Sequence, residues 1–247
     1  MTPTYTLTAQ RTPQGLAYLH LAQKGAEGAP VALVLHGLGR AKEHMLPTLY
    51  AFAQAGYRAV AFDARLHGER DGAGSREARM ETHFVQTMYE TIAGTAGDIS
   101  GLLDALSAQD AALHGVSLGG YITFAALLNE PRLRVATVAM GSPDWLEGLR
   151  ARGLGPGHPG YDLAALANPL DRAPALYPPR PLLMLHGDAD DVVPVQGVRA
   201  LYKRLLPLYK DAPERLALTI FPGLGHHYTD DMAAQSVAWT QKFLPPA

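Results

Sequence analysis

The sequence predicts a protein of the α/β class, in which helices cover both faces of a largely parallel sheet. Apolar runs typical of strands buried on both faces recur along the chain, at residues 31–36, 57–62, 135–140 and 181–186. Segments with helical patterning separate these runs, as expected of parallel strands joined by helices. A serine between two glycines, in the motif Gly-Val-Ser-Leu-Gly at residues 115–119, joins one predicted strand to a helix.

The first half of the chain is expected to supply a hairpin, two buried strands and two helices. These are the hairpin strands 5–8 and 17–21, the buried strands 31–36 and 57–62, and the helices 43–55 and 81–106. The turn-prone Thr-Pro-Gln-Gly at 12–15 closes the hairpin, which we place at the sheet edge. Gly56 stops the first helix, and Gly94 and Gly97 are expected to interrupt the second. The polar, glycine-containing stretch 64–79 is predicted to be a loop.

The second half continues the alternation of strands and helices. Its predicted strands are 111–113, 135–140, 181–186 and 216–221, and its predicted helices are 121–128, 198–206 and 230–243. Residues 141–179 are rich in glycine and proline and poorly periodic, which indicates a small insertion over the sheet edge. We therefore expect a single domain over residues 1–247, with a minimal cap at about 142–179.

Composition narrows the function. The chain has 247 residues, of which 47% are hydrophobic and 18% charged, as in globular proteins. A net charge of −2 without a long basic run argues against nucleic acid or an anionic membrane as the partner. The absence of cysteine excludes disulfides, thiolate metal sites and a cysteine nucleophile. Because the amino terminus lacks a signal-peptide pattern and no apolar stretch could span a bilayer, we expect a cytoplasmic protein.

The motif at residues 115–119 has the form Gly-x-Ser-x-Gly, which is typical of a nucleophile elbow. In such an elbow a sharp turn presents the serine hydroxyl, and the glycines let strand and helix approach closely. The helix start offers a backbone N–H and a positive dipole end to an oxyanion. The alternative is a glycine-rich turn with an incidental serine. To act as a nucleophile, Ser117 needs a base nearby and an acid to orient that base.

Two later loops offer such partners at the ends of predicted strands. Residues 186–194 contain three acid candidates, which are Asp188, Asp190 and Asp191. Residues 223–228 contain two base candidates, which are His226 and His227. The order serine, acid, histidine is that of hydrolases built on a nucleophile elbow. Since the carboxyl ends of parallel strands share one edge, all three loops should meet there.

On these motifs the chain resembles the α/β-hydrolase superfamily over nearly all of its length. The resemblance implies the α/β-hydrolase fold: a mostly parallel central sheet with helices on both faces and a minimal cap. The superfamily pattern His-Gly-x-x-Asp-x-x-Val-Pro implies Asp190 as the acid, and its Gly-His before the last helix implies His226 as the base. His36-Gly-Leu-Gly matches the superfamily's oxyanion loop, which implies that the backbone N–H groups of Leu38 and Leu118 form the oxyanion hole.

More narrowly, residues 35–44 and 63–70 resemble small bacterial carboxylesterase-type hydrolases, which are related to dienelactone hydrolases and to prolyl-oligopeptidase catalytic domains. Dienelactone hydrolases use a cysteine nucleophile, which this chain lacks. The resemblance implies hydrolysis of a small carboxylic ester (EC 3.1.1) through an acyl-enzyme, without cofactor or metal. We expect a small-molecule substrate and a monomer or small homo-oligomer. The alternatives are a thioesterase, a small-peptide hydrolase and a non-catalytic binding protein on the same fold.

Other residues have two interpretations. His67 and Arg70 are predicted to bind the substrate by lining the site, or else to lock their own loop. Trp145, which we assign to substrate binding, and Tyr161 would form pocket wall or pack within the insertion. The insertion's few large apolar groups could wall only a small pocket, so we expect short acyl groups to be preferred over lipid chains.

Three histidines, His36, His114 and His186, each end a strand just before a glycine. Histidines at strand ends could act as metal ligands. No His-x-x-x-His helix accompanies them, and we expect them instead to tie loops together through hydrogen bonds to the backbone.

Overall fold

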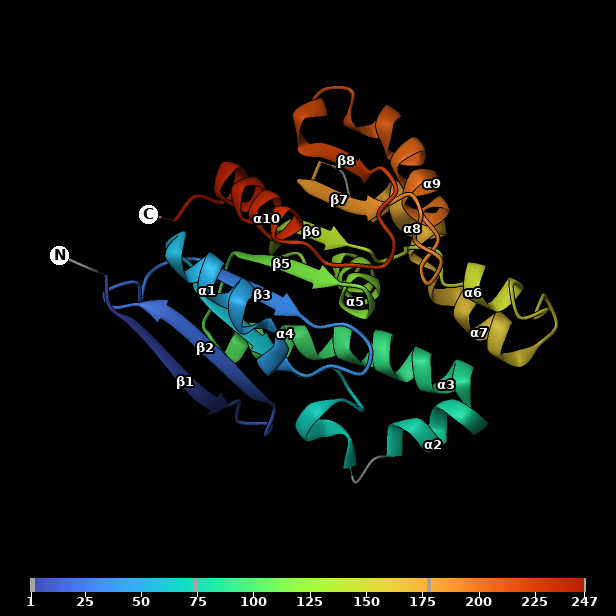
Figure 1. Cartoon of the computed structure of the whole chain (residues 1–247), viewed down its shortest axis with the longest axis horizontal. Coiled ribbons are helices and arrows are strands. Elements are labelled where there is room, and N and C mark those ends of the chain that lie inside the picture. The colour runs from blue at the N-terminus through green and yellow to red at the C-terminus, as the bar shows by residue number, and fades with distance from the viewer. Residues whose placement is uncertain (1–2, 73–74, 177–178, 247) are drawn as a thin grey trace.

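A computed structural model describes residues 3–72, 75–176 and 179–246, and its centre is an eight-stranded sheet in the order β1-β2-β4-β3-β5-β6-β7-β8 (Figure 1). The strands are β1 (Tyr5–Arg11), β2 (Ala17–Gln23), β3 (Val31–Leu35), β4 (Arg58–Phe62), β5 (Ala111–Val116), β6 (Leu133–Ala139), β7 (Leu182–Gly187) and β8 (Leu216–Phe221). From β4 to β8 neighbouring strands pair in parallel, whereas β1 and β2 are antiparallel. The predicted parallel sheet and its edge hairpin are therefore confirmed.

Helices cover both faces of this sheet, as predicted. They are α1 (Leu46–Gln54), α2 (Ser75–Thr82), α3 (Phe84–Tyr89), α4 (Thr95–Ala105), α5 (Leu118–Leu127), α6 (Glu147–Arg150), α7 (Pro159–Ala167), α8 (Pro169–Leu176), α9 (Gln196–Leu205) and α10 (Asp230–Phe243). No helix in the described ranges combines the length and the apolar character needed to cross a bilayer.

Two hydrophobic cores lie on opposite faces of the sheet, because successive strand side chains point to opposite sides. In β3, Leu33 and Leu35 belong to the core that α4, α5 and α9 cover. Ala32 and Val34 belong to the other core, which α1 and α10 cover. Both sets are fully buried, which explains why the run 31–36 is continuously apolar and does not alternate.

The long helix predicted over 81–106 is divided. A break at His83 separates α2 from α3, and a π-helical turn over Glu90–Gly94 joins α3 to α4. Gly94 ends that turn where a Cβ would overlap the Arg65 side chain, so its glycine serves close packing. The second predicted interruption, at Gly97, is wrong, because this glycine lies inside α4 with nothing near its missing Cβ.

Two stretches predicted to be irregular contain helices. The loop predicted over 64–79 includes the start of α2, and its residues 73–74 lie outside the described residues. The insertion at 142–179, of which residues 177–178 also lie outside, contains α6, α7 and α8. Pro159 and Pro169 each occupy the first position of a helix, where no backbone N–H is needed, so these prolines start helices there.

The carboxyl ends of the parallel strands point toward the end of the molecule where α3, α6 and α7 lie (Figure 1). Leu149 of α6 and Ala164 of α7 are buried there in a small cluster, against which Phe84 and Val85 of α3 pack. The insertion and α3 thus form one structure beyond the edge of the sheet where parallel α/β proteins bind ligands.

Candidate active site

Ser117 occupies the sharp turn between β5 and α5. Its backbone has φ +54° and ψ −112°, a conformation unfavourable for a residue with a side chain, and its N–H donates to the Ala139 carbonyl at 2.8 Å. A Cβ at Gly115 would overlap the Gly119 carbonyl, and one at Gly119 would overlap the Leu35 carbonyl. Only glycine therefore fits at positions 115 and 119. This close approach of strand and helix is what the elbow motif predicts.

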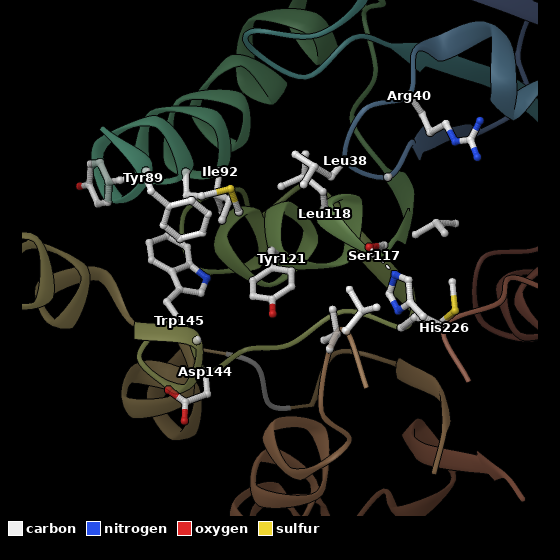
Figure 2. Close-up of a pocket in the computed structure, with 18 of the residues that line it drawn as sticks. Leu38, Arg40, Tyr89, Ile92, Ser117, Leu118, Tyr121, Asp144, Trp145 and His226 are labelled. Carbon is white, nitrogen blue, oxygen red and sulfur yellow. Dashed lines mark hydrogen bonds between the residues drawn. The ribbon is translucent and has the colours of Figure 1, made fainter. Parts of the chain in front are cut away.

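His226 lies between Ser117 and Asp190. Its Nε2 is 2.9 Å from Ser117 Oγ, and its Nδ1 is 2.8 Å from Asp190 Oδ2. A carboxylate only accepts, so Nδ1 donates to Asp190 and Nε2 is free to accept the serine hydroxyl proton. The loops after β5, β7 and β8 supply these three side chains, and Figure 2 shows Ser117 and His226 facing each other.

The other candidates in the same two loops lie elsewhere. Asp188 is exposed and accepts the Gly223 N–H at 2.6 Å, which joins the two loops. Asp191 and His227 are exposed as well. The structure thus brings Asp190 and His226, and none of these neighbours, to Ser117.

Asp190 is held from three sides. Its Oδ1 accepts the backbone N–H groups of Val192 at 3.0 Å and Val193 at 2.8 Å. The Nε2 of His186, buried at the end of β7, lies 2.7 Å from the Val193 carbonyl and 3.2 Å from Asp190 Oδ2. Both neighbours are acceptors, so this nitrogen carries the proton and fixes the acid loop on the backbone, as predicted for His186. Burial lowers the pKa of His186, which favours the neutral ring.

The other two strand-end histidines, His36 and His114, differ in their hydrogen-bond partners. His36 accepts the Ala64 N–H at 3.1 Å through Nε2 and lies 2.8 Å from the Gly37 carbonyl through Nδ1, so its predicted backbone role is confirmed. The same prediction is wrong for His114, whose partners are side chains: the Thr137 hydroxyl at 2.8 Å and the Tyr228 hydroxyl at 2.9 Å. The backbone around His114 is engaged in the pairing of β5 with β3 and β6, which leaves its ring to neighbouring hydroxyls.

His114 should make the fold sensitive to acid. Burial lowers its pKa from 6.5 to about 3, so the unfolded chain binds a proton that the folded chain excludes. Stability from this residue is complete above pH 6.5 and is lost progressively toward pH 3, by about 2 kcal/mol at pH 5. We expect denaturant unfolding to show a smaller loss between pH 7 and pH 5 in His114→Gln than in the wild type. An identical loss in both proteins would contradict this assignment.

The loop after β3 lies against Ser117. A Cβ at Gly37 would be 3.5 Å from the Ser117 Cβ, and the next residue, Leu38, lines the same cavity as the serine. Leu118 is the first residue of α5, so its N–H has no partner within the helix. These two predicted oxyanion residues thus flank the serine from separate elements.

A buried ion pair anchors this loop. Lys42, which ends it, donates from Nζ to Asp63 Oδ2 and from its backbone N–H to Asp63 Oδ1, both at 2.8 Å. Nζ also reaches Glu69 at 2.7 Å. Burial opposes the ionisation of Asp63, but the Lys42 hydrogen bonds outweigh it and lower the pKa of the carboxyl. A charge pair buried with several hydrogen bonds fixes loop geometry, because removing either partner leaves an unpaired buried charge.

The assignment of His67 and Arg70 to substrate binding needs correction. His67 is fully buried, with Nδ1 2.9 Å from the Arg65 carbonyl and its ring 5.2 Å from that of His36. Arg70 donates to the Asp63 carbonyl at 3.1 Å and to Asp98 at 2.7 Å. Neither residue lines the cavity at Ser117. Their side chains instead form hydrogen bonds within the loop and to Asp98 of α4. The structure supports the alternative that they lock this loop.

A cavity of about 730 Å³ opens at Ser117 and extends over the edge of the sheet (Figure 2). On one side of the serine it forms what we name the aromatic chamber, lined by Phe84, Val85, Met88, Tyr89, Ile92, Tyr121, Trp145 and Leu149. Trp145 lines it as predicted, with its ring edge-on to Tyr89 at 6.1 Å, whereas Tyr161 does not reach the cavity. The sequence does not predict the α3 side of the chamber, because the pattern at 84–92 indicates only a helix.

Comparisons with known proteins identify the family to which the chain belongs. The chain matches the prolyl oligopeptidase family over residues 44–245. It is 28% identical over 253 aligned residues to a Bacillus subtilis strain 168 protein named "Putative esterase YitV", covering 95% of this chain and 98% of that one. TT1662 from Thermus thermophilus superposes with a TM-score of 0.76 and 29% identity, covering 97% of this chain and 98% of the other.

A cold-adapted esterase from an Arctic intertidal metagenomic library superposes with a TM-score of 0.69 over 99% of this chain and 95% of that one. At 18% identity this likeness concerns the fold alone. The family match spans most of the chain and includes Ser117, Asp190 and His226. The chain therefore belongs to the prolyl oligopeptidase family and is an esterase-type protein of the α/β-hydrolase superfamily.

Proposed function

We propose that the chain is a serine hydrolase that cleaves small carboxylic esters through an acyl-enzyme. The observation that carries the proposal is the position of His226, 2.9 Å from the Ser117 hydroxyl and 2.8 Å from the Asp190 carboxylate. Serine is a weak nucleophile unless a base lies within hydrogen-bond reach, and here that base is itself oriented by an acid. The esterase name of the Bacillus relative supports the choice of ester over peptide as substrate.

Acylation begins when Ser117 Oγ attacks the ester carbonyl carbon and its proton passes to His226 Nε2. The carbonyl oxygen becomes an oxyanion, which the backbone N–H groups of Leu38 and Leu118 stabilise. Asp190 accepts from Nδ1 of the imidazolium and keeps the ring in place. When the tetrahedral intermediate collapses, the C–O bond to the alcohol breaks and Nε2 returns its proton to the leaving oxygen.

Deacylation repeats these steps with water. His226 Nε2 removes a proton from a water molecule, whose oxygen attacks the acyl carbon. The same two N–H groups stabilise the second oxyanion. Ser117 then leaves as its hydroxyl after taking the proton from His226. A thioester or a small peptide could react through the same steps and the same catalytic atoms. A non-catalytic binding protein would not need this arrangement of serine, histidine and aspartate.

The aromatic chamber should limit the length of the acyl group, with the insertion at 142–179 acting as a minimal cap. Each methylene that fits is expected to contribute about 0.8 kcal/mol, so kcat/KM should rise with acyl length and fall once the chamber is full. We expect the maximum within about eight carbons, as suits a pocket of this size class. The measurement is kcat/KM for p-nitrophenyl esters from acetate to palmitate, below micelle formation.

Tyr89→Ala provides the matched variant for this series, because the half-buried Tyr89 ring forms part of the chamber wall. Its removal should move the preferred acyl group to a longer chain. A wild-type preference that climbs steadily to palmitate, or activity that jumps at a lipid interface, would contradict the small-ester proposal.

A further inference from the structure

The cavity at Ser117 has a surplus of positive charge. Its one acidic lining residue is Asp144, among the residues that the structure describes. Asp144 is compensated, because Oδ2 pairs with Arg150 at 2.5 Å and Oδ1 accepts the Leu146 N–H at 3.0 Å. Two arginines, Arg40 and Arg152, line the same cavity. A cavity with cations and no free carboxylate favours an anionic group on its ligand.

The two arginines differ in what they contact. Arg152 donates to the Gly148 carbonyl at 2.9 Å, and its guanidinium lies 4.2 Å from the centre of the Phe84 ring. The guanidinium of Arg40 is exposed, and within the described ranges no carboxylate or carbonyl accepts from it. Its five N–H donors are therefore available, in the fork geometry that matches a carboxylate or phosphate.

Arg40 also has a defined place relative to the reacting serine. It lies two residues beyond Leu38, its backbone N–H donates to the Gly37 carbonyl at 3.2 Å, and the Lys42–Asp63 pair fixes the end of the loop. In Figure 2 the aromatic chamber lies on one side of Ser117, whereas His226 and, farther out, Arg40 lie on the other side, with the Arg40 side chain directed away from the serine.

The position of the proton donor, His226, determines how an ester lies relative to Ser117. In the proposed mechanism His226 returns its proton to the leaving oxygen, so the alcohol part must lie on the His226 side. The acyl part then points into the aromatic chamber. The alcohol part would then lie outside the chamber, in the portion of the cavity that Arg40 also lines.

We propose that the preferred substrates are esters with an apolar acyl group and an alcohol part that carries an anionic group, a carboxylate in the simplest case, which Arg40 binds. This rests on the proposed ester hydrolysis and names its substrate class. Because Arg40 is exposed, we expect a gain of about 5-fold to 10-fold in kcat/KM, mainly through KM and weakened by salt.

The test compares two esters of similar shape, 4-carboxyphenyl butyrate and 4-carbamoylphenyl butyrate, by release of the phenol. The wild type should prefer the carboxylate ester about 5-fold to 10-fold at low salt. In Arg40→Gln the ratio of the two kcat/KM values should fall to about 1, and in Arg40→Glu below 1. Arg199→Gln is the matched control: it removes the same charge from an exposed position on α9 outside the cavity, and should keep the wild-type ratio.

Equal kcat/KM values for both esters in the wild type, or a preference that survives Arg40→Gln, would overturn this inference and leave ester hydrolysis standing. No turnover of either ester would overturn both. A second pair places the charge on the acyl part: mono-4-nitrophenyl glutarate should react more slowly than 4-nitrophenyl butyrate. A faster glutarate, slowed by Arg152→Gln, would assign the anion to the chamber and contradict the proposal.

Discussion

Ser117→Ala should leave the fold intact and reduce ester turnover by on the order of 10⁴-fold or more. The methyl group keeps the Cβ in the elbow but removes the oxygen that attacks the carbonyl and gives its proton to His226 Nε2. The residual rate should be that of substrate binding and the oxyanion hole alone. The measurements are kcat/KM for a short p-nitrophenyl ester and denaturant unfolding, which checks that the loss is chemical.

Ser142→Ala is the control for this variant. Ser142 follows β6, is fully buried, and accepts the Asp144 N–H at 3.1 Å. It is absent from the lining of the cavity, so its substitution should keep turnover close to the wild type. If Ser117→Ala retained wild-type hydrolysis, or if Ser142→Ala abolished it in a folded protein, Ser117 would not be the nucleophile.

Asp190→Asn should reduce kcat by roughly 10³-fold to 10⁴-fold. An amide can present its NH₂ group to His226 Nδ1, which then accepts, so Nε2 carries the proton and can no longer take one from Ser117. The asparagine amide cannot flip to avoid this, because two backbone N–H groups require its oxygen at the position that Asp190 Oδ1 now occupies. The measurement is kcat at saturating ester for the folded variant.

Asp188→Asn and Asp191→Asn provide matched controls on the same loop. Both side chains are exposed, and neither contacts His226, so each substitution should cost far less than Asp190→Asn. A larger loss at Asp188 than at Asp190 would place the acid two residues upstream and contradict the observed geometry.

The parts of the fold that are specified locally could be predicted from the sequence. The run 31–36 predicts a buried strand because each residue from Val31 to Leu35 faces one of two cores. The elbow glycines at 115 and 119 are predictable for a similar reason, since the close approach of strand and helix tolerates no Cβ. The strand order then brings Ser117, Asp190 and His226 to one edge.

The parts that depend on long-range packing could not be predicted. The aromatic chamber exists because α3 packs against α6 and α7, and no local pattern at 84–92 or in the insertion encodes that contact. The same limit applies to His67, which is fully buried with its ring tilted against that of His36 from another loop. The prediction that the insertion is irregular is wrong for a different reason, because the prolines at 159 and 169 start helices.

The most direct test of the proposed acyl-enzyme mechanism is labelling with a fluorophosphonate, which reacts with an activated serine. The protein should take up one adduct per chain, peptide mapping should place it on Ser117, and ester hydrolysis should disappear at the rate of labelling. Ser117→Ala should take up none, and Asp190→Asn should be labelled far more slowly. Hydrolysis that survives complete labelling of Ser117, or an adduct on another serine that abolishes it, would contradict the mechanism.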